Sequence, residues 1–350
     1  MTEKANIKEL LDFTAKNDIS DLHISTGLPP MVRKSGEIEH FDQPPLEAEE
    51  VLAMIKELAI PEDFQRFEKT GDMDFAYQLG ETARFRVNVF RQMRGPGLVC
   101  RTIPTKILSL EDLKTPSIFA DITLYPRGLV LVTGPTGSGK STTLAAMINE
   151  VNLTRSEHIL TIEDPVEFVH KSQKALVNQR EVGNSTESFA SALRAALRED
   201  PDIILVGEMR DPETIGLALT AAETGHLVFG TLHTSSAAKT IDRVVDVFPE
   251  GEQAMVRAML SESLRAVISQ TLLKKVGGGR VAAHEIMIGT APIRNLIREA
   301  KVPQMYSAIQ TGKNDGMQTL DQCLKELVGQ GIIEQSIAYR AAVNKKDFAD

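Results

Sequence analysis

The feature that most constrains this chain is a glycine-rich run, Gly134–Ser141, which reads Gly-Pro-Thr-Gly-Ser-Gly-Lys-Ser. Two glycines flank four residues, and a lysine and a hydroxyl residue follow, which is the pattern of a phosphate-binding loop. An apolar run of strand type, Leu129–Val132, precedes the loop, and Thr142–Asn152 carries its apolar residues at helical spacing. A strand, a glycine loop and a helix N-terminus therefore follow one another in the order that phosphate binding needs.

Each part of the run has a chemical role. Glycines let the backbone curl until several N–H groups point at one anion, and the helix N-terminus adds partial positive charge. Lys140 would reach the β- and γ-phosphates, and Ser141 would hold Mg²⁺. A glycine-rich turn that binds nothing is the alternative, but the strand, helix, lysine and serine are all in place. We expect nucleotide contacts from nine residues: Gly134, Pro135, Thr136, Gly137, Ser138, Gly139, Lys140, Ser141 and Thr142.

Length and composition limit the class of protein. The chain of 350 residues has room for two domains, and its 42% apolar and 25% charged residues are ordinary for a soluble globular protein. No apolar run approaches the roughly 18 residues that span a bilayer. The first residues, Met1–Asn6, lack the basic-then-apolar design of a signal peptide. We therefore expect a cytoplasmic protein without direct membrane insertion.

Charge and cysteine content argue against two further kinds of site. The net charge of −9 opposes a broad nucleic-acid surface, which needs a basic field, although a local basic channel stays open. The sequence contains only Cys100 and Cys323, which are too few for a four-thiolate zinc site or a disulfide framework.

The first 103 residues mix short helical and strand patterns, which is typical of a small α+β domain. Helices are expected over residues 4–17, 46–58 and from Pro61, and strands over 22–25, 72–78, 83–90 and 98–103. Residues 31–41 predict a hairpin that turns at Ser35-Gly36. Residues 104–122 contain prolines and weak patterns, so we expect them to form a linker.

Residues 123–350 favour a second, larger domain of the α/β class. Apolar strands are expected over 158–163, 202–208 and 227–231, with helices over 142–152, 188–197 and from Pro212. Strands that alternate with helices indicate a mostly parallel sheet, whose ligands bind at the carboxyl ends of the strands. From Pro249 onward the pattern is mainly helical, with a turn at 277–279 and one strand over 281–288.

Four carboxylates fall at the ends of the expected strands: Glu163, Asp164, Glu167 and Glu208. Hydrolysis of a γ-phosphate needs a placed metal, neutralised charge and an aligned water. We assign Glu208 to Mg²⁺ through a water-mediated contact, and Glu167, then Glu163, to orienting the attacking water. The alternative is structural: single acids that cap helices or pair with Arg180 and Arg210.

Two histidines, His226 and His233, lie seven residues apart across an expected strand. No cysteine cluster or third ligand lies nearby, so a metal site is not expected. We expect both to face the nucleotide edge and one to sense the γ-phosphate, with a structural histidine as the alternative for each.

Five arginines gather at the end of the first part: Arg84, Arg86, Arg91, Arg94 and Arg101. A solvated basic strand face is the simplest interpretation. Alternatively, arginines supplied from another domain or subunit stabilise transition-state charge on a nucleotide.

Four stretches follow in a set order: the phosphate loop (134–142), an acidic box (159–168), a strand ending in Glu208 (202–211) and a histidine box (224–234). In this order they resemble the secretion-superfamily hexameric ATPases. A fifth stretch, Ala291–Glu299, resembles the Ala-Ile-Arg-Asn-Leu-Ile-Arg-Glu signature of the retraction ATPases of the type IV pilus. Pro292 departs from that signature, in a first helical turn that tolerates proline.

The resemblance implies a RecA-like P-loop ATPase domain, a smaller PAS-like N-terminal domain and a ring of six subunits. ATP and Mg²⁺ would lie between domains, with Arg84, Arg86, Arg91 and Arg94 closing over the phosphates. It further implies a motor for pilus retraction and twitching motility, at the cytoplasmic face of the inner membrane. Its partners would be the platform protein of the pilus machine and a paralogous ATPase.

Three alternatives stay open. The first is a paralogous accessory retraction ATPase, although such paralogues match the fifth stretch less well. Extension and secretion relatives usually carry a four-cysteine zinc element, for which this sequence has too few cysteines. A regulatory nucleotide-binding ring is suggested by Glu208, where an Asp is more usual. A DNA-translocating ATPase conflicts with the acidic charge of the chain.

Overall fold

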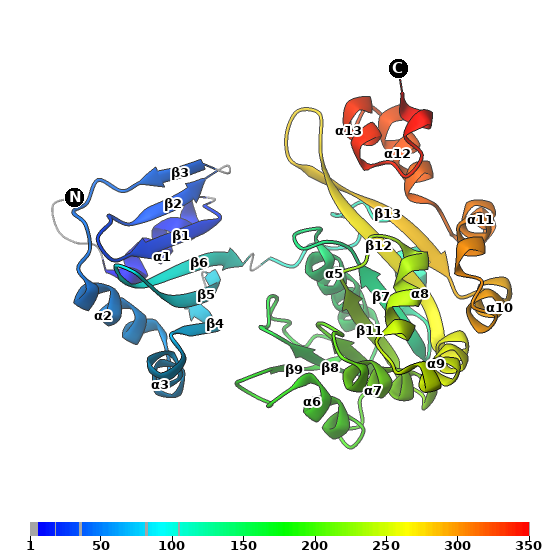
Figure 1. Ribbon diagram of the computed structural model, residues 1–350, viewed down its shortest axis with the longest axis horizontal. Coiled ribbons are helices and arrows are strands. Elements are labelled where there is room, and N and C mark those ends of the chain that lie inside the picture. The colour runs from blue at the N-terminus through cyan, green and yellow to red at the C-terminus, as the bar shows by residue number, and fades with distance from the viewer. Residues whose placement is uncertain (1–5, 18, 35–36, 81–82, 104–105, 350) are drawn as a thin grey trace. The chain divides into compact units, whose positions relative to one another are not determined.

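The computed structural model describes residues 6–17, 19–34, 37–80, 83–103 and 106–349 (Figure 1). The chain divides into two compact units. The first comprises residues up to Lys106 together with Pro165–Val169, and the second comprises Ile107–Asp164 and His170–Asp350. The turn predicted at Ser35-Gly36, the first two residues of the helix predicted over 4–17, and residues 104–105 of the predicted linker lie outside the described residues.

The first unit is built on an antiparallel sheet. Its elements are α1 (Ile7–Lys16), β1 (Asp21–Ser25), β2 (Met31–Lys34), β3 (Glu37–His40), α2 (Ala48–Leu58), α3 (Pro61–Thr70), β4 (Asp72–Leu79), β5 (Ala83–Gln92) and β6 (Gly95–Ile103). The strand order is β3-β2-β1-β6-β5-β4, and neighbouring strands are antiparallel. The predicted α+β class of this part is confirmed.

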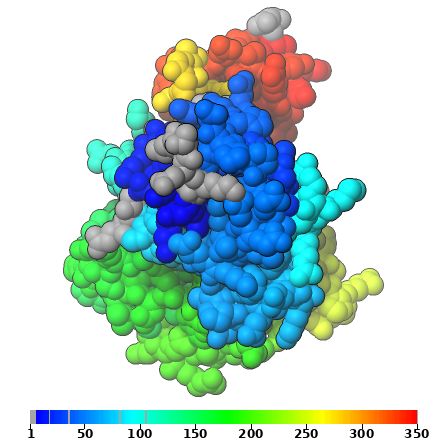
Figure 2. All heavy atoms as spheres, turned by 90° about the vertical axis from the view of Figure 1, so that its left-hand side faces the viewer, coloured from blue at the N-terminus to red at the C-terminus, as the bar shows by residue number. Residues whose placement is uncertain are grey.

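Local sequence explains how the first unit forms its core. Phe85, Val87 and Val89 alternate along β5 and are fully buried, while Arg84 and Arg86, one residue before Phe85 and one after it, are half-buried on the opposite face. These apolar side chains pack with residues of α1, α2 and α3 in one continuous core. In the space-filling view of Figure 2 the atoms of this unit, drawn in blue, pack closely together.

The second unit is built on a mostly parallel sheet. Its elements up to that sheet's last strand are α4 (Ile118–Thr123), β7 (Gly128–Thr133), α5 (Lys140–Thr154), β8 (His158–Glu163), β9 (Leu176–Glu181), α6 (Phe189–Ala196), β10 (Ile203–Val206), α7 (Pro212–Glu223), β11 (Leu227–Leu232), α8 (Ala237–Asp246), α9 (Glu250–Ser263), β12 (Leu264–Lys274) and β13 (Arg280–Ile288). The strand order is β13-β12-β7-β11-β10-β8-β9, parallel throughout except for the antiparallel β12–β13 pair.

Helices close the chain after β13. They are α10 (Ala291–Arg298), η1 (Val302–Gln304), α11 (Met305–Thr311), η2 (Lys313–Asp315), α12 (Leu320–Gly329), α13 (Gln335–Ala341) and η3 (Lys345–Phe348), and Figure 1 shows them in orange and red. Both cysteines are buried, Cys100 in β6 and Cys323 in α12, and burial raises the pKa of each thiol. Among the described residues, no helix is both long enough and apolar enough to cross a bilayer.

The parallel sheet follows the predicted pattern because its central strands are buried on both faces. Every residue of β7, β10 and β11 is buried, as expected for strands covered by helices on either side. The predicted α/β class of the second part is confirmed.

The structure corrects two expectations about the order of elements. The region after Pro249 contains a second long strand, β12, and residues 176–181 form β9, neither of which was predicted. Residues 107–122 are not an isolated linker, because Leu110, Phe119 and Ile122 belong to the core of the second unit. The apolar residues of β12 lie mainly at Ala266–Ile268 and Leu272-Leu273 with no period of two, so a strand could not be distinguished from a buried helix.

Candidate phosphate-binding site

The phosphate loop connects the carboxyl end of β7 to the N-terminus of α5, as predicted. Gly139, which caps α5, has a φ of 87°, and Gly137 has a φ of 78°. Only glycine adopts this left-handed region without strain. A side chain on Gly137 would meet no atom within 4 Å, so the requirement there is conformational, and the loop remains open on that side.

The loop carries the groups that a polyphosphate needs. Lys140 Nζ lies 3.0 Å from the carbonyl oxygen of Gly134 and 3.2 Å from that of Pro135, so its ammonium is held against the loop. Ser138 Oγ is buried with no hydrogen-bond partner, while Ser141 is exposed in the first turn of α5. A helix N-terminus, an ammonium and an unsatisfied hydroxyl form a donor set that fits phosphate oxygens.

Glu208 lies two residues beyond β10 and is bound by two basic side chains. His233 Nε2 lies 2.8 Å from Glu208 Oε1, and Arg210 Nε lies 2.6 Å from the same oxygen. Burial acts to raise the pKa of Glu208, but hydrogen bonds and charges from Arg210 and His233 outweigh it and hold the pKa below its usual value. The carboxylate is therefore anionic at neutral pH, at the same sheet edge as the phosphate loop.

Glu163 ends β8 and is held by neighbours on the sheet. Its Oε1 accepts hydrogen bonds from Thr161 Oγ1 at 2.6 Å and from Gln179 Nε2 at 3.2 Å. Glu167, the first choice for orienting water, lies in the segment Pro165–Val169, which groups with the first unit. Its place relative to the phosphate loop therefore stays a prediction.

The two histidines lie at opposite edges of the sheet, which corrects the expectation that both face the nucleotide. His233 follows β11 and contacts Glu208, but His226 precedes β11. The carbonyl oxygen of His226 accepts a hydrogen bond from the N–H of Gly128, at the start of β7. A strand of this length separates its ends by about 20 Å at ~3.3 Å per residue. His226 therefore lies at the amino end of β11, and a role for it in catalysis stays a prediction.

The predicted arginines have partners within the first unit. Arg86 Nε donates to Asp74 across β4 and β5 at 3.0 Å, and Arg91 donates to the carbonyl oxygen of Glu68 at 3.1 Å. Arg84 Nε donates to the carbonyl oxygen of Val166 at 2.9 Å, while Arg94 lies exposed in the turn between β5 and β6. A role over the phosphates stays a prediction for all four.

Sequence reasoning missed three buried residues that contact the loop or each other: Thr143, Gln270 and His284. Gln270 and His284 face one another on β12 and β13, and Thr143 lies in the first turn of α5. The polar triplet Ser269-Gln270-Thr271, with apolar residues on both sides, was the available signal, because a buried amide needs hydrogen-bond partners.

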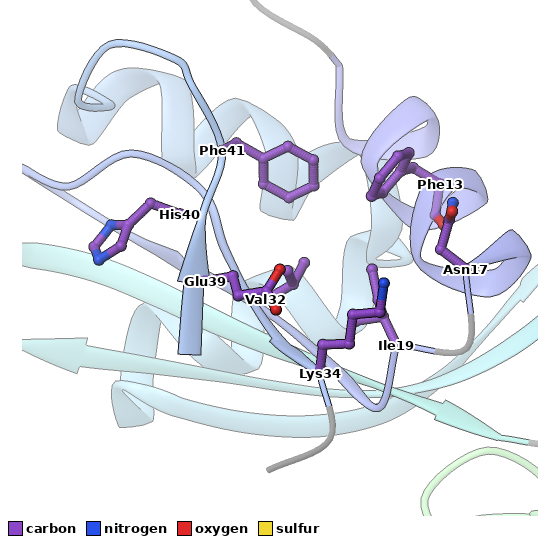
Figure 3. A pocket seen from close by; sticks show the side chains of 8 residues that line it. All are labelled: Phe13, Asn17, Ile19, Val32, Lys34, Glu39, His40 and Phe41. Carbon is purple, nitrogen blue, oxygen red and sulfur yellow. The ribbon is translucent and has the colours of Figure 1, made fainter. Parts of the chain in front are cut away.

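One cavity borders the loop and another lies on the first unit. One of about 170 Å³, on the second unit, is lined by Pro135, Ser235, Ser269, Gln270, Thr271, Glu285, Leu320 and Ala341. The other, of about 130 Å³ on the first unit, is shown in Figure 3. There the rings of Phe13 and Phe41 meet edge to face, with centroids 5.3 Å apart. None of the predicted site residues lines the cavity in Figure 3, so we assign it no part in nucleotide chemistry.

Comparison with known proteins places this geometry in a family. Residues 7–278 match the family described as "Type II/IV secretion system protein". The chain is 64% identical over 343 residues to the type IV pilus retraction ATPase PilT of Pseudomonas aeruginosa, covering 98% of this chain and 100% of the relative. It is 61% identical to a twitching motility protein of Neisseria gonorrhoeae, covering 91% of this chain and 86% of the relative.

A solved structure agrees over nearly the whole chain. The crystal structure of the pilus retraction motor PilT with bound ADP matches with a TM-score of 0.91 at 47% identity, covering 98% of this chain and 99% of that one. The fold, the ordered motifs and these matches agree. The chain therefore belongs to the type II/IV secretion system protein family.

Proposed function

We infer that this protein is an ATPase that powers retraction of the type IV pilus and thereby twitching motility. One observation carries the inference: a phosphate loop with Lys140 at the same sheet edge as the anionic Glu208 and its partner His233. Relatives more than 60% identical are named for pilus retraction and twitching motility, and the 47% identical motor binds ADP.

The residues divide the work of hydrolysis between them. Backbone N–H groups of the loop and the Lys140 ammonium bind the β- and γ-phosphates. Ser141 and Glu208 would hold Mg²⁺, which neutralises phosphate charge when bound. Glu167 or Glu163 orients the attacking water, and His233, through Glu208, responds to the γ-phosphate. Arg84, Arg86, Arg91 and Arg94, from this or a neighbouring subunit, stabilise the charge that develops.

We base the proposed oligomeric state, location and partner on the family. We propose a homohexamer in the cytoplasm, at the inner face of the inner membrane, that acts on the platform protein of the pilus machine. An N-terminal PAS-like domain over residues 1–103 and an ATPase domain over residues 123–350 move relative to one another during the cycle. The packed segment 107–122 travels with the ATPase domain.

The first test is biochemical. Purified protein should release phosphate from ATP in the presence of Mg²⁺ and elute as a hexamer, and Lys140→Ala should abolish turnover while keeping the ring. Lys325→Ala is the matched control, because Lys325 only pairs with Asp347 on the surface of α12. Turnover at the wild-type rate in Lys140→Ala would contradict the proposed mechanism.

The second test separates the motor from its alternatives. Deleting the gene should abolish twitching while pili remain, which is the expected result for the motor. Unchanged twitching would instead indicate a regulatory ring or an accessory paralogue, and ATP hydrolysis stimulated by DNA in a salt-sensitive manner would indicate a translocase.

A further inference from the structure

A buried glutamine lies directly beside the phosphate loop. Gln270 is 3% exposed and follows Ser269, which pairs with Thr133, the last residue of β7. The strand β12 thus continues past the end of β7, and Gln270 is its first residue beyond that end, at the point where the loop begins. Gln270 comes from a part of the chain more than 120 residues away from the loop.

The amide of Gln270 binds the loop on both sides of the turn that presents Lys140. Its Nε2 donates to the carbonyl oxygen of Ser138 at 2.6 Å, and its Oε1 accepts from Thr143 Oγ1 at 2.7 Å. Both bonds are buried. Lys140 and Ser141 lie between the two anchored residues, so one side chain restrains the segment that carries the phosphate-binding ammonium and hydroxyl.

Two loop glycines lie against the same residue. A Cβ on Gly134 would come within 2.2 Å of the carbonyl oxygen of Gln270, and a Cβ on Gly139 within 2.9 Å of its Nε2. The loop could not pack this closely on β12 with larger residues at these positions.

A second buried side chain holds the amide in place. His284 Nε2 lies 3.2 Å from Gln270 Oε1, and burial lowers the pKa of His284 to about 4, so the ring is neutral at pH 7. The Ser138 carbonyl can only accept, which directs the amide NH₂ toward it and leaves Oε1 for Thr143 and His284. The His284 ring packs edge to face on Phe119, with centroids 5.0 Å apart.

We propose that Gln270 is a positioning residue for the phosphate loop, held in orientation by His284. The proposal rests on the nucleotide-binding function inferred above. It assigns to Gln270 no contact with the nucleotide. Its role is to keep Lys140 and the loop N–H groups in the conformation that binds phosphates.

The experiment compares four single variants and one double variant of the full-length protein. Gln270→Leu removes both loop bonds at similar volume, Thr143→Val removes one, and Thr143→Ser retains the hydroxyl. Gln318→Leu is the matched control, because Gln318 Nε2 donates to the carbonyl oxygen of His284 but does not contact the loop. For each variant we would measure the Kd of ADP by calorimetry, kcat and KM for ATP, the melting temperature and the oligomeric state.

Positioning predicts a specific pattern. Gln270→Leu and Thr143→Val should each weaken ADP binding about tenfold, because the first removes the amide that binds the Ser138 carbonyl oxygen and the Thr143 hydroxyl, and the second removes the hydroxyl that ties α5 to Gln270. Thr143→Ser and Gln318→Leu should bind ADP like the wild type. In the double variant Gln270→Leu/Thr143→Val the two losses in binding free energy should not add, since Gln270→Leu already removes the hydrogen bond to Thr143 that Thr143→Val removes.

Other outcomes overturn the proposal. A lower melting temperature with unchanged Kd and KM would make Gln270 purely structural. Additive losses in the double variant would also contradict positioning. Should Gln270→Leu not fold, equal weakening in Thr143→Val and Thr143→Ser would still contradict it. Absence of ADP binding and turnover in the wild type would instead contradict the proposed function.

Discussion

The two sheets of this molecule distribute their polar side chains differently. In the antiparallel sheet of the first unit, charged residues spread over one face, where Arg86 pairs with Asp74 across β4 and β5. In the parallel sheet both faces are buried, and the polar groups gather at the carboxyl ends, where Glu208 and His233 follow β10 and β11. The role of a residue therefore depends on its side of the strand in the first unit and on its position along the strand in the second.

The largest effect should come from the interior of the parallel sheet. Phe229→Ala in β11, whose side chain is fully buried, should lower the free energy of unfolding by about 3–5 kcal/mol through lost contacts and a cavity. Denaturant unfolding followed by circular dichroism measures the loss. Leu153→Ala in α5, where the side chain is 53% exposed, is the control, and an equal loss there would contradict the comparison.

The next effect should appear in activity rather than stability. Glu208→Gln should lower kcat for ATP about 100-fold or more, because a preorganised charge at the phosphate edge is lost. Steady-state phosphate release measures it. Glu199→Gln is the control: Glu199 pairs with Arg180 but precedes β10, so its variant should hydrolyse ATP normally.

The Glu208→Gln variant also allows a test of how the free energy of unfolding depends on pH. The folded-state pKa of Glu208 lies below its usual value of 4.5, so its ionised form stabilises the fold above that pH. This stabilisation is lost as the pH falls through the lowered pKa. The difference in unfolding free energy between wild type and Glu208→Gln should therefore be constant near neutral pH and shrink in acid. A difference in unfolding free energy that grows below pH 4.5 would contradict this prediction.

The two ends of β11 allow a comparison within one strand. His233→Gln should lower kcat about tenfold, because it removes a hydrogen bond to a charged carboxylate. The kcat of His226→Gln should stay within about twofold of the wild-type value, since a whole strand separates His226 from the phosphates. Paired kcat measurements decide, and equal losses would show that position along the strand does not matter.

The smallest effect on stability should come from the antiparallel face. Arg86→Ala should cost only about 0.2–1 kcal/mol, because its pair with Asp74 is exposed to solvent. Asp74→Ala breaks the same pair. If Arg86 acts on the nucleotide, its variant alone will lose ATPase activity; equal activity in both variants would limit Arg86 to the ion pair.

Much of the fold could be predicted because its signals are local. The phosphate loop, the alternation in β5 and the proline at the start of α7 each fix a conformation within a few residues. The strand β12 was missed because its apolar residues follow no period of two, and such a pattern indicates burial without specifying a strand.

The missed site residues depend on sheet order. Gln270 reaches Ser138 only because β12 lies next to β7, and no spacing in the sequence encodes that neighbour. Likewise, the position of His226 relative to the phosphates depends on the bounds of β11, which runs from one histidine to the other.

The burial of both cysteines has a practical consequence. Cys100 and Cys323 lie in separate units, and their thiols resist ionisation, so the native chain should react little with maleimides. Surface cysteines introduced one per unit could then carry a donor and an acceptor dye on an otherwise unlabelled background. Energy transfer between the dyes would follow each unit's movement through single rounds of turnover.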